Sequence, residues 1–442
     1  MKKLLLIPLA IVLVTALIFG GCAAEEEVPT EIRIGCSSAL TGIYSGFCSH
    51  GAFGLQAAAE DMNALGGIYV EEYGKRLPVR LILADCESDN TKAGTLAEDL
   101  IVRDDVHFLI QAGGPQPMIT PISTVAERYK LLWVGVDGIK EQFFAVREAV
   151  SPSWKYSWNI CFAVGMPYPP GSFWDKPGYT VADSTAVFLD DIFARTNGKV
   201  GVYATDDIDG RGWFEGTTPM AEAAGFDVCG KEKALGIFPM GTTDFTSLVN
   251  EWKNYGCELI MGNAPAVETG TILRQSRELG FKPKAIWATK GALFHQDISA
   301  WGGDLPNGVV TELHWHPSLP AEDHPGIGGT TPVSLHERWV ATGHQYSPAI
   351  AFGYGSSQVL YDAIERAGTL ETEAVMEAVG ETNLKTLLCH VVFDKENQFA
   401  GFPMMLGQWR EVDQPWQWEC PLLIVLHYDA DTTDLLFPIP YD

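Results

Sequence analysis

Charged side chains occur in the loops that follow several predicted strands, where they could pair with a small charged molecule. Asp137 follows the predicted strand 131–134, Asp207 and Asp209 follow 199–203, and Lys290 follows 284–287. In open α/β sheets, ligands bind beyond the carboxyl ends of the strands. These four residues are therefore candidate ligand-binding groups. For Lys290 the alternative is a solvated loop position.

Small and polar residues occupy the other loops of this kind. Ser38 and Thr41 follow the predicted strand 32–36 and precede a helix, whose free N–H groups and dipole favour a carboxylate. A simple helix-capping turn is the alternative for this segment. Backbone N–H groups or amides in the remaining loops could add further contacts, from Gly113, Gly114, Gln116, Gly138 and Asn263.

Motifs for metal binding or catalysis have little support. His314 and His316 flank Trp315 and would share one face of a strand, with His324 nearby, but no Cys or acid cluster accompanies them. A wall of the cleft near a crossover is the alternative for these bulky strand residues. The chain has no GxSxG elbow, GxxxxGK[ST] loop, GxGxxG after a strand or HExxH. We therefore expect no metal, no cofactor and no enzymatic activity.

The elements that must position these residues alternate between strands and helices. Strands are predicted near 32–36, 79–84, 107–111 and 131–134, and again at 199–203, 226–229, 258–261 and 284–287. Helices of about 12–15 residues lie between them, a pattern typical of parallel sheets covered by helices on both faces. A Trp- and Pro-rich stretch, 150–177, is predicted to be irregular and separates the two series.

Length and charge narrow the class of protein further. The chain has 442 residues, more than the roughly 250–300 that one core usually serves, so two lobes are expected. Its formal net charge of −26 makes nucleic acid and anionic lipid surfaces poor partners. Eight cysteines besides Cys22 permit disulfides, but their spacing does not identify pairs, and buried thiols are equally consistent.

The N-terminus has the features of an export signal. Lys2 and Lys3 precede an apolar run to Phe19, and Gly20 and Gly21 lead into Cys22. This arrangement resembles the cleavage site of bacterial lipoproteins, which implies a signal peptide at 1–21, lipid on Cys22 and a tether at 22–30. We expect an exported protein, periplasmic or at the cell surface, anchored to a bacterial membrane.

Several segments, in this order, resemble the periplasmic leucine/isoleucine/valine-binding family, the type 1 solute-binding proteins of ABC importers. Ile32 to Gly42, with the helix 51–63 and Gly66-Gly67-Ile68, matches the opening of that family. Later matching segments are Leu81 to Ala93, Gly241 to Leu248, Ile272 to Gln275, Phe352 to Tyr354 and Val392 to Asn397.

The resemblance implies an α/β fold of two lobes, the Venus-flytrap, in which each lobe is a parallel sheet flanked by helices. Three crossovers are expected near Asn159, Glu312 and Leu388. They would divide the chain into 31–158 plus 318–386 for lobe 1 and 159–317 plus 387–442 for lobe 2.

The resemblance also gives roles to residues of the cleft. It places Phe47 where relatives have an aromatic over the ligand. In the loop 112–116 relatives commonly have a Ser that binds the ligand carboxylate, and here Gly114 and Gln116 could substitute for it through a backbone N–H and a side-chain amide. Lys290 stands where amino-acid binders have the acid that pairs with the ligand ammonium. A Lys there would repel an ammonium, because like charges about 4 Å apart cost about 4 kcal/mol at an effective dielectric of 20.

Two interpretations of Lys290 therefore stay open. The ligand carries no ammonium at that position, or Lys290 pairs with Asp137 across the cleft and Asp207 or Asp209 serves as the acid. Our sharper expectation is a ligand carboxylate held by Lys290, Ser38, Thr41 and the Gly113 and Gly114 amides, with its apolar body against Phe47 and Trp315.

In function, the resemblance implies capture of a small organic solute, such as an amino acid, amide or carboxylate, and delivery to permease subunits of a branched-chain-amino-acid-type ABC importer. We expect a monomer tethered through Cys22. The alternative is a sensing module of the same fold that signals to a partner protein.

Overall fold

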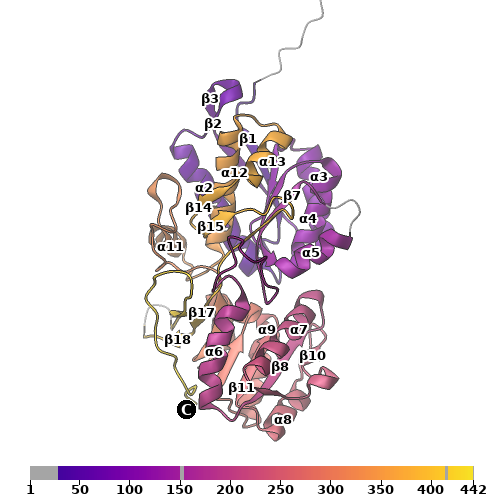
Figure 1. Cartoon of the computed structure of the whole chain (residues 1–442), viewed down its shortest axis with the longest axis vertical. Helices are drawn as coiled ribbons and strands as arrows, with labels where there is room; N and C mark the ends of the chain where they lie inside the picture. The colour runs from indigo at the N-terminus through magenta and orange to yellow at the C-terminus, as the bar shows by residue number, and fades with distance from the viewer. Residues whose placement is uncertain (1–27, 150–153, 414–416, 442) are drawn as a thin grey trace, which may run out of the picture.

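The computed structural model describes residues 28–149, 154–413 and 417–441, and shows two α/β lobes stacked along the long axis (Figure 1). The predicted signal peptide, 1–21, and Cys22 lie outside the described residues. No helix in the described ranges is both long and apolar enough to cross a membrane. The two-lobed fold class expected from the sequence is confirmed by the two separate sheets.

The first lobe is built on a six-stranded sheet in the order β16-β7-β6-β5-β1-β4, and all its pairings are parallel. Its strands are β1 (Ile32–Ser38), β4 (Val79–Asp85), β5 (Phe108–Ile110), β6 (Trp133–Ile139), β7 (Ser157–Phe162) and β16 (Phe399–Gly401).

Helices cover both faces of this sheet. On one face α2 (Ser45–Ala64) packs along α12 (Ile350–Ala367), and on the other α3 (Asn90–Val102) packs against α4 (Gln116–Tyr129). The lobe is completed by α5 (Lys140–Ala149), α11 (Pro332–Val340), α13 (Thr372–Gly380), η1 (Glu71–Tyr73), η4 (Ile327–Gly329) and the hairpins β2–β3 (Ile68–Val70, Lys75–Leu77) and β14–β15 (Asn383–Lys385, His390–Val392).

The second lobe has an eight-stranded sheet in the order β10-β8-β11-β12-β13-β17-β20, with β9 also paired to β8. Its first six strands in sequence are parallel: β8 (Lys199–Thr205), β9 (Asp227–Val228), β10 (Ile237–Phe238), β11 (Leu259–Asn263), β12 (Ala285–Ala288) and β13 (Val309–Leu313). At the opposite edge β17 (Met405–Gln408) and β20 (Leu422–Ile424) run antiparallel to their neighbours.

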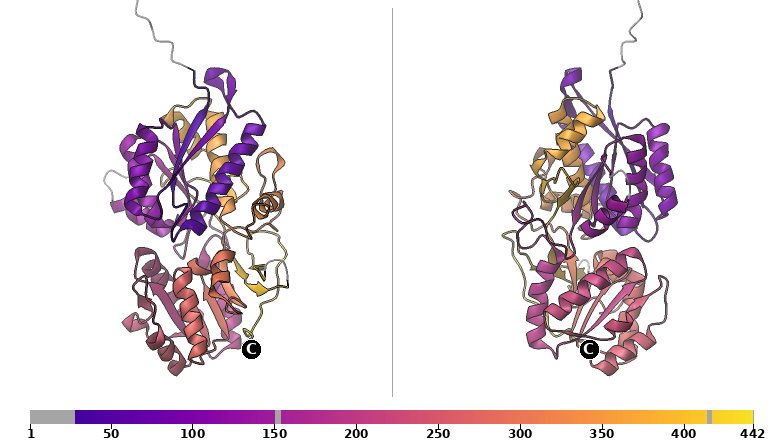
Figure 2. Two further views of the ribbon diagram at one scale, coloured as in Figure 1. Left: turned by 180° about the vertical axis from the view of Figure 1, so that it is seen from behind. Right: turned by 45° about the vertical axis from the view of Figure 1, so that its right-hand side comes forward.

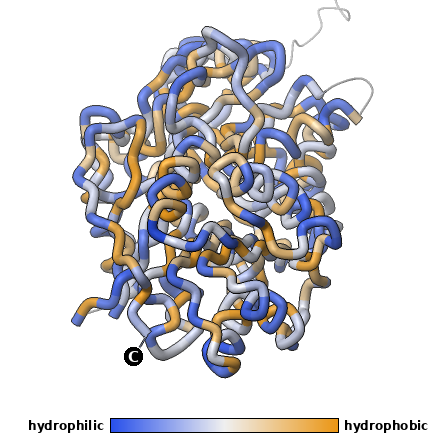
Figure 3. Tube along the Cα trace, turned by 60° about the horizontal axis from the view of Figure 1, so that its bottom comes forward, coloured by the Kyte–Doolittle hydropathy of each residue, from blue (hydrophilic) through white to orange (hydrophobic). Residues whose placement is uncertain are grey.

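Figure 2 shows the helices of this second lobe around its sheet from two further sides. They are α6 (Val181–Arg195), α7 (Ile208–Ala223), α8 (Thr246–Tyr255), α9 (Ala266–Glu278) and α10 (His295–Trp301), with η2 (Lys231–Lys233), η3 (Lys290–Ala292) and the small ladder β18–β19 (Arg410–Glu411, Trp418–Glu419). Hydrophobic and hydrophilic stretches alternate along the trace in Figure 3, as expected when each element buries one face.

The chain passes between the sheets three times, and two of the expected boundaries need correction. Residues 157–162 form β7 of the first sheet, so that sheet keeps residues beyond 158, inside the stretch predicted to be irregular. Residues 399–401 form β16 beside β7, so the third passage lies between 401 and 405, not near Leu388. The strand 399–401 is too short to show a period-2 pattern, and its pairing with a distant strand placed it in the first lobe.

The first passage is held by two neighbouring side chains at the start of α5. The Glu141 carboxylate accepts the N–H groups of Val164, Gly165 and Met166 at 2.8–3.0 Å. Lys140 Nζ donates to the Met166 carbonyl at 3.0 Å and lies 3.9 Å from the centre of the Tyr168 ring. These contacts tie the 164–168 segment to the first lobe where the chain leaves it.

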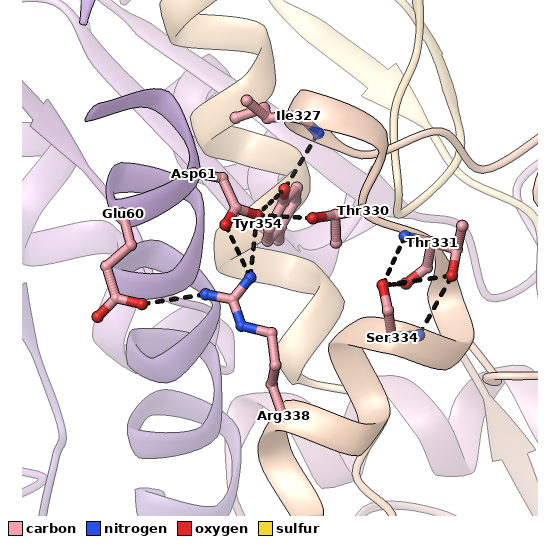
Figure 4. A network of polar contacts seen from close by, with 8 residues as sticks. All are labelled: Glu60, Asp61, Ile327, Thr330, Thr331, Ser334, Arg338 and Tyr354. Carbon is pink, nitrogen blue, oxygen red and sulfur yellow. Dashed lines mark hydrogen bonds and ion pairs between the residues drawn. The ribbon is translucent and has the colours of Figure 1, made fainter. Parts of the chain in front are cut away.

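A polar network also fixes the 326–340 segment to the first lobe (Figure 4). Asp61 on α2 accepts hydrogen bonds from Arg338 Nη1 at 2.8 Å, Thr330 Oγ1 at 2.8 Å and Tyr354 OH at 2.6 Å. Arg338 also pairs with Glu60 at 3.0 Å. We call the group of Asp61, Thr330, Arg338 and Tyr354 the Asp61 latch.

Candidate functional site

A cavity lies between the two lobes, at the carboxyl ends of strands from both sheets. Its volume is about 30 Å³, enough for roughly two water molecules. Seven of its lining residues come from the first lobe and seven from the second: Phe47, Pro115, Gln116, Asp137, Gly138, Ile139 and Phe162, and Asp209, Trp213, Asn263, Lys290, Leu293, Glu312 and His314.

Lys290 is paired within its own lobe. Its Nζ lies 2.8 Å from Asp209 Oδ2 and 3.9 Å from Asp207 Oδ2, and its side chain is only 7% exposed. Burial alone lowers the Lys290 pKa, but the two carboxylates outweigh burial and raise it to about 12. The expected pairing of Lys290 with Asp137 across the cleft is therefore wrong, and Lys290 is a buried cation already neutralised by Asp209.

Asp137 lies on the opposite wall without a cationic partner. Its Oδ2 accepts the Gly114 N–H at 3.1 Å. Burial, with a smaller contribution from Asp209, raises the pKa of this carboxyl to about 7, while the N–H groups of Gly138 and Gly114 oppose the shift. The group therefore changes charge near neutral pH.

Glu312 is a second cavity carboxyl without a cationic partner, although the Lys290 backbone N–H donates a hydrogen bond to it. It lies on β13, is 3% exposed, and its Oε2 has no hydrogen-bond partner. Burial raises its pKa well above the usual range, and the charges of Asp209 and Asp137 raise it further. Buried polar groups are normally satisfied, so a buried carboxyl oxygen without a donor beside a cavity points to a missing partner.

Other cavity side chains also present unused atoms. Asn263 Nδ2 donates to Thr289 Oγ1 at 2.9 Å and Gln116 Nε2 donates to Thr120 Oγ1 at 3.0 Å, which leaves both amide oxygens without partners. Both ring nitrogens of His314 are unpaired, and burial lowers its pKa to about 3. The cavity therefore offers mainly hydrogen-bond acceptors to a ligand.

The backbone is strained at both charged walls. Asp137 has φ +73° and Lys290 has φ +33°, in the left-handed region that non-glycine residues seldom adopt. Such strain persists only where the surroundings impose it, and it clusters at functional sites.

Of the residues proposed from the sequence, seven line the cavity: Phe47, Gln116, Asp137, Gly138, Asp209, Asn263 and Lys290. Asp207 lies just outside, where it caps α7 by accepting the Gly210 N–H at 2.8 Å. The other five proposed residues, Ser38, Thr41, Gly113, Gly114 and Trp315, do not line it.

The positions of Thr41, Ser38 and the two glycines correct the expected carboxylate cradle. Thr41 Oγ1 donates to Asp85 Oδ2 at 2.8 Å in an exposed turn, and Ser38 is buried with its hydroxyl unpaired. The Gly114 N–H is used by Asp137. Gly113 and Gly114 have φ +130° and +127°, and a Cβ at either would lie 2.9 Å from the Phe352 ring or the Cys48 Sγ, so these glycines permit close packing.

Trp315 does not line the cavity, because its side chain points into the core. It is fully buried and donates from Nε1 to the Leu387 carbonyl at 3.0 Å. Alternation along this segment instead turns Glu312 and His314 toward the cavity. Sequence reasoning missed Glu312, although an acid inside the apolar run 309–313 was a usable signal, and it gave a cleft wall only as an alternative for His314; it also missed Phe162, Trp213 and Leu293.

The histidines near β13 do not converge. His316 contacts Ser318 and His324 contacts the Leu387 carbonyl, while His314 faces the cavity. In the described ranges, no three His, Cys, Asp or Glu side chains are arranged to hold a metal ion. The eight cysteines other than Cys22 are buried free thiols.

A larger chamber of about 400 Å³ adjoins the cavity and shares Phe47 and Lys290 with it; we call it the vestibule. The start of α2 and the loops before α9 and α10 form its walls, with Ile43, Tyr44, Met240, Val267, Phe294 and Asp297 among the lining residues. Phe47 meets Phe294 edge to face, with ring centres 4.8 Å apart. Burial raises the pKa of Asp297 to about 6.

Comparison with known proteins places the fold and the family. Residues 31–414 match the periplasmic binding protein family. The chain is 22% identical over 382 residues to the Leu/Ile/Val-binding protein homolog 2 of Brucella abortus, covering 86% of this chain and 91% of the relative.

Solved structures share the same fold. A leucine-binding protein from Thermotoga maritima is 21% identical with a TM-score of 0.62, covering 88% of this chain and 97% of its own. A putative branched-chain amino acid ABC transporter protein from Silicibacter pomeroyi is 17% identical with a TM-score of 0.69, covering 92% and 99%. The family resemblance seen in the sequence is thereby confirmed: this chain belongs to the periplasmic binding protein family and is a type 1, two-lobed solute-binding protein.

Proposed function

We propose that this protein captures a small organic solute between its lobes outside the cytoplasmic membrane and delivers it to the permease of an ABC importer. The observation that carries the proposal is the cavity to which both lobes contribute buried polar groups. A ligand that contacts both lobes stabilises the closed arrangement, because it binds that state better than an open one. A permease can then distinguish loaded from empty protein by the spacing of the lobes.

We propose that binding involves no chemistry, because the family to which the chain belongs is one of binding proteins. Solved structures with the same fold include the branched-chain amino acid transporter substrate-binding protein of Streptococcus pneumoniae in complex with isoleucine. This similarity favours import over the sensing alternative.

The test is solute-dependent closure. Small-angle X-ray scattering of the purified protein should show a smaller radius of gyration with its solute than without it. A solute at 100 times its Kd should also stabilise the protein by about 2.7 kcal/mol in thermal unfolding. A broad library of amino acids, amides, amines and carboxylates that produces neither change would contradict the proposal.

The tether completes the proposal. We propose that Cys22 carries lipid after cleavage of residues 1–21 and holds the protein at the membrane surface. Cys22→Ser should release the protein into the soluble fraction of cells. Retention of a processed Cys22→Ser protein on membranes would rule out the lipid anchor.

A further inference from the structure

The charges of the cavity do not balance. Asp137, Asp209 and Glu312 face it from three elements, and Lys290 is the one cation among its lining residues. Lys290 is committed to Asp209 at 2.8 Å. Asp137 and Glu312 therefore remain without a cation, and no basic side chain of the lining is free to receive a carboxylate from a ligand.

Most of the unused atoms of the cavity are hydrogen-bond acceptors. Glu312 is 3% exposed with Oε2 unpartnered, and the amide oxygens of Asn263 and Gln116 are also without donors. The Gly114 N–H is already used by Asp137. In the empty cavity burial favours the neutral form of Glu312, and an entering cation would favour its charged form. A ligand group that donates several hydrogen bonds and carries positive charge is therefore complementary to these atoms.

The size of the cavity selects among cationic groups. A space of about 30 Å³ holds roughly two water molecules. A primary ammonium is similar in size to water and donates three hydrogen bonds, whereas a trimethylammonium is larger and donates none. The adjoining vestibule, about 400 Å³ and walled by Tyr44, Phe47 and Phe294, accommodates a larger apolar body.

We propose that the solute is a primary amine without an α-carboxylate, whose ammonium enters the cavity between Asp137 and Glu312 and whose apolar body fills the vestibule. This inference rests on the proposed function and specifies its solute. An α-amino acid is disfavoured because its carboxylate, adjacent to the ammonium, would enter the same acidic cavity.

The test compares matched ligands by isothermal titration calorimetry on the purified protein at pH 7.5. One set is 2-phenylethylamine, phenylalanine, 3-phenylpropanoate and trimethyl(2-phenylethyl)ammonium; 3-methylbutylamine and 1,5-diaminopentane extend the amines. At least one primary amine should bind, and the matched acid, amino acid and quaternary ammonium should bind more than tenfold more weakly.

Variants then assign the contact. Asp137→Asn and Glu312→Gln should each weaken the amine more than tenfold, because each removes a charge-assisted partner in a desolvated site. Asp190→Asn, on the exposed face of α6, is the matched control and should bind as the parent does. Circular dichroism and thermal unfolding of the unliganded variants establish that they are folded.

Three outcomes overturn the inference: no amine of the panel binds, the carboxylate or amino acid binds as tightly as the amine, or both cavity variants keep the parent affinity. Closure on a carboxylate or an amino acid would remove the amine inference and leave the proposed function standing. Absence of closure with every solute class would remove both.

Discussion

The Asp61 latch and the cleft use the same chemical group in opposite ways. Asp61 accepts hydrogen bonds from three side chains, one of them the guanidinium of Arg338. Asp137 accepts one backbone N–H across 3.1 Å, and Glu312 has an oxygen with no partner. A carboxylate whose bonds are complete stabilises the fold, whereas one left incomplete beside a cavity is available to a ligand.

Lys290 lies in the cleft, but like the residues of the Asp61 latch it already has its partner. Its charge is satisfied by Asp209, so its removal would leave a buried carboxylate without compensation. The following predictions test which acidic residues stabilise the fold and which are available to bind a ligand. They are ordered from the largest expected effect to the smallest.

Lys290→Met should be the most destabilising change. Removing one member of a buried ion pair typically costs about 3–5 kcal/mol, because the other charge is left uncompensated. Urea denaturation should show this loss in the unfolding free energy. The double variant Lys290→Met with Asp209→Leu should recover much of it, and a single variant as stable as the parent would show that the pair is not structural.

Asp61→Ala should cost about 1–3 kcal/mol, because Arg338, Thr330 and Tyr354 lose a shared acceptor in a partly buried site. Solute affinity should change less than twofold, since the latch does not line the cavity. Asp61→Asn, which keeps an acceptor oxygen, should lose less stability. Equal losses in the two variants would mean that the hydrogen bonds are not responsible.

The pH dependence of stability should report on Asp137. The folded-state pKa of about 7 lies above the ordinary 3.8, so the folded protein holds an extra proton between these values. Stability contributed by that proton is therefore present at low pH and lost as the pH rises through about 4 to 7.

Asp137→Asn should thus become progressively more stable than the parent across this window, by on the order of a few kcal/mol at most, with no further change above about pH 7. Asp209, Glu312 and Lys290 face the same cavity, and the charge of Asp137 contributes to the raised pKa of Glu312. The same substitution is therefore also made in a Glu312→Gln background, where the difference in stability no longer includes Glu312. Thermal unfolding at pH 4.5, 6 and 8 measures it. A difference independent of pH would contradict the assignment.

Arg211→Gln should have the smallest effect. Arg211 pairs with Asp206 at 2.6 Å beside the cleft acids, but both side chains are about half exposed. Surface ion pairs contribute little because water and salt screen them. The denaturation midpoint should not change measurably, and a clear loss would show that this pair supports the Asp207–Asp209 loop.

Much of the fold and the position of the cleft could be read from the sequence. Alternating short apolar strands and amphipathic helices predicted both sheets, because each element's periodicity is local. The ends of those strands located Asp137, Asn263 and Lys290, since parallel strands bring their carboxyl ends to one edge. Glycine and hydroxyl residues near β1 and β5 were less informative, because such residues serve turns and close packing equally well.

Only the tertiary structure decided which charges meet. Lys290 pairs with Asp209 of its own lobe, and this choice depends on how the loops after β8 and β12 approach each other. The face of β13 that meets the cleft carries Glu312 and His314, while Trp315 points into the core. A periodic pattern shows that residues alternate, but the packing of the second lobe against the first determines which face contacts the solute. The third passage, which follows β16, could not be located from the sequence for the same reason. Residues 399–401 pair with β7, a strand distant in sequence, and only the tertiary structure shows that pairing.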